Sequence, residues 1–397
     1  MNKSAGPTRM LAKQLGKLYS RIPDPLDRVL LKAYRRIREN IPRWITVERV
    51  SGYDIFVNKP ISILLVGSSP ASEYFLHRLI GKKHSREQLG RPDRGDAVVL
   101  VRERRHHHDL AIIQGPRSWT DTAFDAAYWR VPAAIGNDVN LQFATGKEPW
   151  INNSNRPNLH RIRKHGFVRS ISHAQSDFEY FYHRMYMPYI RERFGEFVQA
   201  RSEHRMRRYF RSGALIWASL GSQRLAATLI NCADQRATSW IFAPNPERQD
   251  AVKMGAISAT YLFSLEWAIE QEMHRLNLGP SRACLLDGVL RYKKHWGASL
   301  VEDRSVREDL LFSWQRMTPA IFRFLHESPL VVRQGNQFAG LTAIVPGSEG
   351  DAGKTEVHLK SIAEAGLSKL IVIATATHNS EFAQIKGIPI RWLPVSD

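Results

Sequence analysis

One segment in the second half of the chain constrains the fold more than any other. The four apolar residues 283–286 predict a short strand, and Asp287 then turns the chain into a basic helix over 288–295. An aromatic residue and a glycine, Trp296-Gly297, follow where that helix must stop. The bend Leu278-Gly279-Pro280 leads into the segment from a long amphipathic helix. The pattern predicts helix, bend, strand and helix in close succession.

Size and composition favour a globular protein of two or three domains, because 397 residues with 43% hydrophobic side chains can fill real cores. The two cysteines, Cys232 and Cys284, lie in segments typical of strands, which excludes a disulfide framework and a multi-cysteine zinc site and fits a reducing cytoplasm.

No apolar run approaches the roughly 20 residues that a membrane-spanning helix needs. The first forty residues lack the apolar core and cleavage site of a secretory signal. We therefore expect a cytoplasmic protein.

The charge of the chain indicates a polyanionic partner. A net charge of +19 attracts nucleic acid, anionic lipid, acidic polysaccharide or an acidic carrier protein. Two short helices predicted within residues 10–40 carry basic faces, which either rest on the inner face of the membrane or are simply solvated. Peripheral membrane association thus stays open.

Composition and periodicity divide the chain into four parts. We expect a basic helical segment over 1–42, an α/β unit over 43–150, a third part over 160–304, and a helical connection with a β-α-β appendage over 305–397. In the second part we expect strands over 45–50, 61–66 and 97–101, a helix over 72–80 and a mobile loop over 81–95.

The third part predicts a helix from residue 176 or 177, a three-stranded meander and a second long helix. The meander strands are expected over 214–220, 224–231 and 237–243, and the second helix over 254–276. The last part predicts a helix over 305–327 and then strands over 341–345 and 370–374, with a helix over 357–365 between them.

Two local patterns resemble ligand-binding motifs, but the arrangement of their residues does not fit a ligand site. His106-His107-His108 reads as part of a strand, where neighbouring side chains alternate faces and cannot easily share one metal ion. Gly353-Lys354-Thr355 hints at a phosphate-binding loop, but Ser348 stands where its first glycine would have to be. We expect no metal site.

The order helix, three-stranded meander, helix, strand, helix between residues 165 and 300 resembles the GNAT acyltransferase fold. Within that fold the chain is more similar to the FemAB/FemX-like branch, which has tandem GNAT domains, and to related acyltransferases of exopolysaccharide and cellulose biosynthesis. The resemblance covers about residues 160 to 300 and rests on segments 161–166, 181–195 and 288–297. It implies a mixed α/β (α+β) fold, tandem GNAT-like, with a degenerate first unit.

The resemblance also implies an activity. The expected reaction is transfer of an acyl or aminoacyl group to an amine or hydroxyl of a cell-envelope or polysaccharide precursor. The donor would be a thioester, acyl-CoA or acyl carrier protein, or an aminoacyl-tRNA, so tRNA or a carrier protein is an expected partner. Hydrolysis through a serine or cysteine nucleophile is disfavoured, because no Gly-x-Ser-x-Gly elbow is present and both cysteines lie in apolar segments.

The candidate donor site is the start of the second long helix. Free amides and a partial positive charge at a helix N-terminus suit a pyrophosphate, and Gly255 would permit its close approach. We predict cofactor binding by Lys253, Gly255 and Ala256, with Arg248 upstream. An ordinary helix start with one glycine explains the same residues.

Three residues at the strand-to-helix junction are candidates for chemistry. Asp287 is either a catalytic base or the N-cap of the helix. Tyr292 could protonate a leaving thiolate or ribose hydroxyl, as tyrosines at similar positions do in GNAT enzymes, or it packs. Lys293 matches the lysine of the family motif, and its ammonium would neutralise a phosphate or a developing oxyanion.

The remaining candidates are predicted to contact the acceptor. Arg191 and Arg193 could hold phosphate or carboxylate bidentately, with Tyr182 and Tyr186 beside them, or they form surface ion pairs. Trp296 stacks on a sugar or fills the core. The rival to an enzyme is a non-catalytic basic module that binds nucleic acid or an anionic membrane surface, but no basic stripe interleaved with aromatics favours it.

Overall fold

The computed structural model describes two compact units. The meander unit comprises residues 161–233 and 240–264, and the large unit comprises residues 43–160, 234–239 and 265–397. The predicted basic segment over 1–42 lies outside the described residues. The structure describes residues 44–144, 146–194, 202–248, 250–303, 305–346, 352–375 and 382–395.

The meander unit is built on neighbouring antiparallel strands, as predicted. β7 pairs with β8, and β8 pairs with β9 through a tight turn at Gly221, whose φ is +54°. The last residues of β10 lie beside β9. The strands are β7 (Val168–Ser172), β8 (Gly213–Leu220), β9 (Gln223–Ala233) and β10 (Arg236–Pro244). The predicted three-stranded meander is confirmed.

Helices cover this sheet with aromatic side chains. Phe178, Phe181 and Met185 are completely buried and pack with Trp217 of β8, because successive turns of helix place them on one face. The helical stretch passes through a π-helical turn over Phe181–Tyr186. The helices are α6 (Arg156–His165), α7 (Gln175–Tyr180), α8 (Met187–Phe194), α9 (Glu203–Arg211), α10 (Ala251–Met254) and α11 (Ala256–Glu270).

The large unit contains a six-stranded mixed sheet with the order β3-β1-β2-β4-β13-β5. β2 and β4 are parallel, and the other neighbours run antiparallel. β13 comes from far along the sequence and lies between β4 and β5. The strands are β1 (Val47–Tyr53), β2 (Pro60–Val66), β3 (His84–Gly90), β4 (Leu110–Pro116), β5 (Trp129–Pro132) and β13 (Glu308–Trp314).

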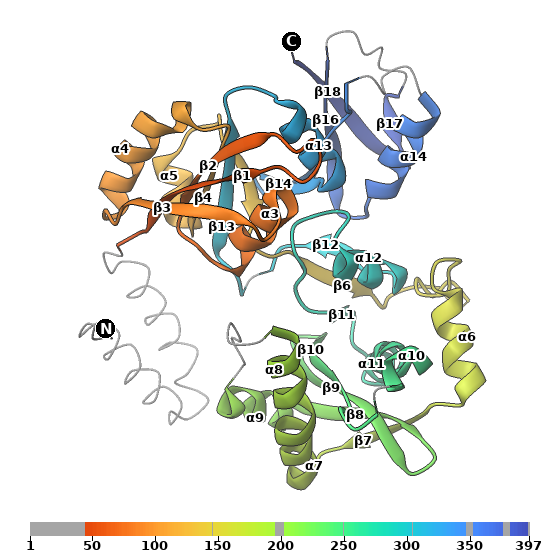
Figure 1. The fold of residues 1–397 in the computed structure, drawn as a ribbon. Coiled ribbons are helices and arrows are strands. Elements are labelled where there is room, and N and C mark those ends of the chain that lie inside the picture. The colour runs from red at the N-terminus through yellow and green to blue at the C-terminus, as the bar shows by residue number, and fades with distance from the viewer. Residues whose placement is uncertain are drawn as a thin grey trace, which may run out of the picture. The chain divides into compact units, whose positions relative to one another are not determined.

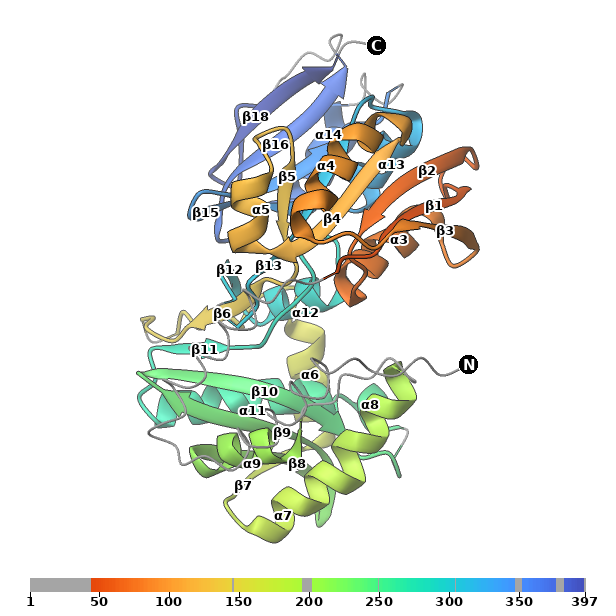
Figure 2. The same cartoon turned by 90° about the vertical axis from the view of Figure 1, so that its left-hand side faces the viewer.

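Alternating side chains of β2 give this sheet two buried faces. Ile63 and Leu65 pack with α3 (Pro70–Ile80), whereas Leu64 and Val66 pack with α4 (Arg94–Arg104). α5 (Arg117–Ala123) follows β4 directly. Figures 1 and 2 show α3 and α4 on opposite sides of the sheet.

The C-terminal region of the large unit forms a second sheet with the order β14-β15-β16-β18-β17. β15 and β16 are parallel and are joined by α14, which confirms the predicted β-α-β unit. α13 precedes it and packs into the same core as α3. The elements are α13 (Pro319–Glu327), β14 (Leu330–Gln334), β15 (Gln337–Ala343), α14 (Ala352–Ile362), β16 (Leu367–Thr375), β17 (Gln384–Ile385) and β18 (Ile388–Val395).

Three short paired strands of the large unit flank the segment that carries the candidate site. β11 (Arg275–Asn277) runs parallel to the first residues of β10 and antiparallel to β6 (Gly136–Asn140). β12 (Ser299–Val301) pairs with the other side of β6. The chain reaches α12 (Gly288–His295) from β11, and β12 follows that helix. Together with the two sheets, the ladder confirms the mixed α/β class.

Several predicted elements differ from the structure. Residues 97–101 belong to helix α4, and 84–90 of the predicted loop form an edge strand. Residues 308–314 are strand β13 rather than helix. The apolar residues 283–286 form only an isolated bridge, from Cys284 to Leu330. The helix expected over 254–276 ends at Glu270.

Over the described ranges, no helix has the length and apolar character needed to cross a bilayer.

Candidate functional site

The candidate site of the large unit is built around the start of α12. Asp287 caps this helix: its Oδ1 accepts hydrogen bonds from the amides of Val289 and Leu290, both at 3.0 Å. The N-cap interpretation of Asp287 is therefore confirmed. The helix ends at His295, as the sequence predicts, and Gly297 follows with φ +80°.

Gly297 has no room for a side chain. A Cβ atom built there would lie 2.5 Å from the Cβ of Pro149. The positive φ and this close approach both demand glycine. The end of α12 is thereby fixed, and with it the position of the residues one turn earlier.

Lys293 lies inside the protein, with only 4% of its surface exposed. Its Nζ donates to the carbonyl oxygens of Gly279 at 2.9 Å and Pro280 at 2.8 Å, on the bend after β11. Asn137 also donates to the Gly279 carbonyl, at 2.9 Å. Burial lowers the pKa of Lys293 to about 7, and the nearby carboxylates of Asp287 and Asp303 oppose that change.

An amine with such a pKa exists in both protonation states near neutral pH. It can give or accept a proton there, which an ordinary lysine cannot do. In the ammonium form it has three N–H donors, and the two carbonyls of the bend are its hydrogen-bond acceptors in the described part of the chain. The two carbonyls thus use two of those three donors.

Helix α3 contributes a residue to the same place. The hydroxyl of Tyr74 donates to Oδ2 of Asp287 at 3.1 Å, across 213 positions of sequence. Burial raises the pKa of Tyr74, and the neighbouring Cys284 and Asp287 raise it further. Tyr74 therefore stays protonated and keeps the Asp287 carboxylate in place.

Two arginines accompany the Tyr74 ring. The guanidinium carbons of Arg78 and Arg282 each lie 5.7 Å from the ring centre. Arg78 donates to the carbonyl of Glu327 and to the hydroxyl of Ser328, both of which are neutral. Burial lowers the pKa of Arg282, and the charge of Asp287 counteracts this. In the described chain, neither arginine forms an ion pair with Asp287.

Cys284 lies beside this cluster but is a poor nucleophile. Its side chain is completely buried, and burial raises the pKa of its thiol. The thiol therefore stays protonated at neutral pH.

Three aromatic residues predicted to contact substrate are core residues. Tyr182 and Tyr186 expose 8% and 3% of their surfaces in the core of the meander unit. Trp296 is completely buried, so it fills the core and offers no face to a sugar. Tyr292 is half-buried, and its ring meets the ring of Trp296 edge-on at 6.3 Å between centres.

The predicted donor site belongs to the meander unit, whereas Asp287 and Lys293 belong to the large unit. Gly255 ends the short helix α10 with φ +99°, and α11 begins at Ala256, so these residues do mark a helix start. Lys253 is exposed. Arg248 holds the carboxylate of Asp250 with two contacts of 3.0 Å. Binding of a cofactor by these residues stays a prediction.

The remaining predicted residues are on the surface or only partly described. Arg191 is exposed on α8. Arg193 lies on the same helix, and its side chain is outside the described residues. His108 is buried and its Nδ1 lies 2.7 Å from the hydroxyl of Ser62. In the described parts of the chain, no three His, Cys, Asp or Glu side chains are arranged to hold a metal ion.

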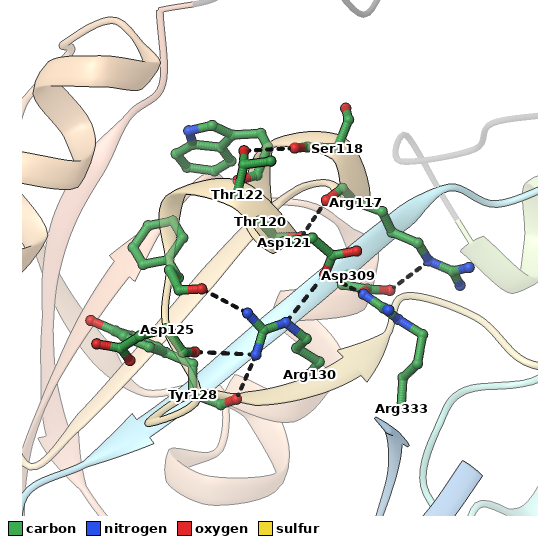
Figure 3. A network of polar contacts seen from close by, with 12 residues as sticks. Arg117, Ser118, Thr120, Asp121, Thr122, Asp125, Tyr128, Arg130, Asp309 and Arg333 are labelled. Atoms are coloured by element: carbon green, nitrogen blue, oxygen red, sulfur yellow. Dashed lines mark hydrogen bonds and ion pairs between the residues drawn. The ribbon is translucent and has the colours of Figure 1, made fainter. Parts of the chain in front are cut away.

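A second charged cluster of the large unit surrounds Asp309, which is completely buried on β13. Arg117 donates to its Oδ1 at 2.9 Å, and Arg333 donates to its Oδ2 at 2.6 and 3.0 Å. Arg333 also reaches Asp121, which pairs with Arg130 at 3.2 Å, as Figure 3 shows. Arg117 further pairs with Glu302. Three arginines and three acids thus balance.

Sequence reasoning missed Tyr74 and Arg282. Nothing in the sequence around Tyr74 distinguishes it from other aromatic residues of an amphipathic helix. Arg282 does follow the bend within the conspicuous segment, which is a signal that could have found it.

No protein-family model and no curated protein matches this sequence. Among solved structures, the chain is similar to L-PGS from Bacillus licheniformis, with 12% identity over 70% of this chain and 88% of that chain and a TM-score of 0.34. It is similar to FemX, with 10% identity, 68% and 85% coverage and a TM-score of 0.35. It is also similar to a tandem GNAT protein from the clavulanic acid biosynthesis pathway, with 11% identity, 64% and 76% coverage and a TM-score of 0.26.

All three TM-scores are below 0.5, so these likenesses carry no conclusion about what the chain does. Its activity has to be inferred from its own residues.

Proposed function

We propose that this protein is an acyl- or aminoacyltransferase whose reaction centre contains Lys293. One observation carries the proposal: the lysine that matches the family motif is buried, is held by the carbonyls of a bend, and has a pKa lowered to about 7. A lysine that only supports a fold more often keeps its charge in water.

The protein has two tasks in the proposed reaction: it stabilises a negative charge and it transfers a proton. An amine or hydroxyl of the acceptor attacks the donor carbonyl, which forms a C–N or C–O bond and an oxyanion. The carbonyl then re-forms, and the C–S bond of a thioester or the C–O bond of an aminoacyl ester breaks. The proton lost by the acceptor ends on the leaving sulfur or oxygen.

The described residues suit these steps. The Lys293 ammonium stabilises the oxyanion with its third N–H donor. Tyr292, at the preceding position of α12, gives its proton to the leaving group and is reprotonated by the proton that the acceptor loses. Asp287 holds the start of α12 and favours the charged form of Lys293. Because its oxygens already accept three hydrogen bonds, its role is positioning rather than proton abstraction.

The substrate classes follow from the family resemblance of the sequence and are part of the proposal. The donor is an acyl-CoA, an acyl carrier protein or an aminoacyl-tRNA, and the acceptor is a cell-envelope or polysaccharide precursor. The net charge of +19 suits each of these anionic partners and peripheral association with an anionic membrane.

The test begins with mass spectrometry of ligands that co-purify with the full chain. An acyl-CoA, a charged tRNA or a lipid-linked sugar would identify the donor or acceptor, and transfer is then measured with those substrates. Lys293→Met should lower kcat at least about 100-fold, the typical effect of losing an oxyanion donor. Arg291→Gln, an exposed change on the same helix, should retain turnover.

Wild-type turnover in Lys293→Met would remove this lysine from the reaction. Absence of transfer from every donor, together with salt-sensitive binding of random RNA or of anionic vesicles, would favour the non-catalytic alternative.

A further inference from the structure

Asn137 is a buried polar side chain of β6 next to the bend that holds Lys293. It exposes 2% of its surface, and its Nδ2 donates to the carbonyl oxygen of Gly279 at 2.9 Å and to the hydroxyl of Ser281 at 3.0 Å. The carbonyl oxygen of Ile135 lies 3.3 Å from the same nitrogen. Because two of these three partners are carbonyls, which only accept hydrogen bonds, the amide nitrogen rather than the amide oxygen faces them.

The main chain around Asn137 holds the same bend. The carbonyl of Asn137 accepts from the amide of Leu278 at 2.8 Å, and the backbones of Ile135 and Ser281 exchange hydrogen bonds of 2.9 and 3.0 Å. Both ends of the bend are therefore tied to β6 and to the residues just before it. The side chain of Asn137 adds a contact in the middle of the bend, at Gly279, so the direction of that carbonyl is fixed as well.

One oxygen joins Asn137 to Lys293. The Gly279 carbonyl accepts from Nδ2 of Asn137 and from Nζ of Lys293, each at 2.9 Å, so the two nitrogens are no farther apart than twice that distance. A carbonyl oxygen has two lone pairs, and these two donors use both. Because the two donors share the negative charge of one oxygen, this carbonyl binds the lysine ammonium less strongly than a carbonyl with a single donor would.

The charges near Lys293 act against its lowered pKa. The titratable groups that face it are the carboxylates of Asp287, at the start of α12, and Asp303, after β12, and both favour the ammonium. Burial outweighs them and lowers the pKa of Lys293 to about 7. Other charged groups of α12 and β6 have ion-pair partners in the described chain: Lys294 with Glu364, and Asp138 with Arg236. The state of the amine therefore depends on the bend that covers it.

We infer that Asn137 is a positioning residue for Lys293: its amide holds the bend over the amine and limits how strongly the Gly279 carbonyl binds it. This inference deepens the proposed function and rests on it, because the position of the amine matters to catalysis only if Lys293 takes part in the reaction. Asn137 keeps the amine away from water and weakly enough bound to exchange a proton near neutral pH.

The inference is tested by urea denaturation of the full chain between about pH 6 and pH 10, in pairs of proteins that differ only by Lys293→Met. For the wild type, the stability difference within the pair should begin to rise at about pH 7, where the folded amine loses its proton while the unfolded one keeps it. Asn137→Ala frees the Gly279 carbonyl and admits water. Both changes favour the ammonium, so the rise should begin about one pH unit higher.

Two aspartate variants sharpen the test. Asn137→Asp keeps the shape of the side chain and places a carboxylate near the amine, so it should move the start of the rise further than Asn137→Ala does. It also provides the measurement if Asn137→Ala is too unstable to titrate. Asn140→Asp adds the same charge at an exposed position of β6, where the side chain can still accept from the amide of Gln142. This control should move the start by less than about half a pH unit.

Two results would overturn the inference. One is a rise that starts at the same pH in the wild type, Asn137→Ala and Asn137→Asp. A purely structural asparagine gives this result, because lost packing destabilises both members of a pair equally. The other is a wild type whose stability difference from Lys293→Met does not vary with pH.

The inference and the proposed function fail separately. In the proposed reaction the ammonium is the active form, so wild-type kcat should fall as pH rises through the pKa of Lys293. Asn137→Ala should move that fall about one pH unit higher and change KM less than about twofold. Unchanged turnover in Lys293→Met, together with the expected shift in stability, would reject the reaction centre and retain the positioning by Asn137. Loss of turnover in Lys293→Met without any shift in the Asn137 variants would do the reverse.

Discussion

Two of the buried carboxylates of the large unit, Asp309 and Asp287, have opposite electrostatic surroundings. Asp309 is bound by two arginines, which are themselves bound by further acids. Asp287 is satisfied by two amides and a tyrosine, while the cations near it make no ion pair with it in the described chain. A closed set of pairs fixes strands to one another. Lys293, by contrast, is bound by two neutral carbonyls, so no carboxylate within hydrogen-bond distance neutralises it in the described chain, and we place the proposed reaction there.

The largest effect is expected from a substitution that removes the central carboxylate of the Asp309 cluster. Asp309→Asn leaves Arg117 and Arg333 without their shared carboxylate, so the free energy of unfolding should fall by about 3–5 kcal/mol. Urea denaturation measures this, with the exposed change Glu103→Gln as control. A loss of less than about 1 kcal/mol, the size of a surface pair, would show that the network contributes no more than exposed ion pairs do.

The second prediction concerns the pH dependence of stability, which reports the lowered pKa of Lys293. The pKa of Lys293 is about 7 in the folded protein and 10.5 ordinarily, so between these values the unfolded chain binds the extra proton. Stability of the wild type should therefore rise with pH over this window, relative to Lys293→Met, by up to roughly 1.4 kcal/mol per pH unit. Denaturation of both proteins at pH 7 and pH 9 measures the difference.

A constant difference between the two proteins over that pH range would contradict the lowered pKa of Lys293. It would also remove the argument that this amine exchanges a proton near neutrality.

A smaller effect probes the link between α3 and Asp287. Tyr74→Phe removes the hydroxyl that donates to Oδ2 and should cost about 1 kcal/mol of stability. Because the N-cap hydrogen bonds remain, α12 should stay folded, and KM should rise more than kcat falls if Tyr74 only positions Asp287 and Arg282. A fall in kcat alone would instead give Tyr74 a direct part in the reaction.

The smallest effect is expected at Arg291, which is exposed on α12. Arg291→Gln should change stability by less than about 0.5 kcal/mol. A larger change would mean that total charge, rather than the buried position of Lys293, governs this region.

Local patterns predicted much of the fold. The apolar runs of the meander with the turn residues between them, and the signals around Asp287 and Gly297, predict the observed elements, because each depends on neighbours a few positions away. Strand β13 was read as helix. Its residues Leu310, Leu311 and Phe312 are all completely buried, and a central strand covered on both faces shows no alternation.

Helix α4 shows the opposite error, because the sequence predicts a strand over its residues 97–101. The run Val98-Val99-Leu100-Val101 has the β-branched residues of a strand, but Asp93 caps a helix there by accepting from two amides. Tertiary packing of Val101 against β2 then overrides the intrinsic preference.

The candidate site was predictable only in part. Asp287 and Lys293 lie in one short motif, so the sequence shows them together. Tyr74 meets Asp287 through a fold that joins α3 to a segment 213 residues away, and no local pattern contains that contact. The contact of Arg282 with the Tyr74 ring likewise joins two segments that lie far apart in the sequence.

The position of β13 has a consequence for synthesis of the chain. β4 and β5 are each paired with β13, whose residues 308–314 are translated long after both. A nascent chain on the ribosome therefore presents two unpaired strand edges until most of the polypeptide has emerged. We expect its early portion to need protection from aggregation, and truncation before residue 308 should yield insoluble fragments rather than a smaller folded protein.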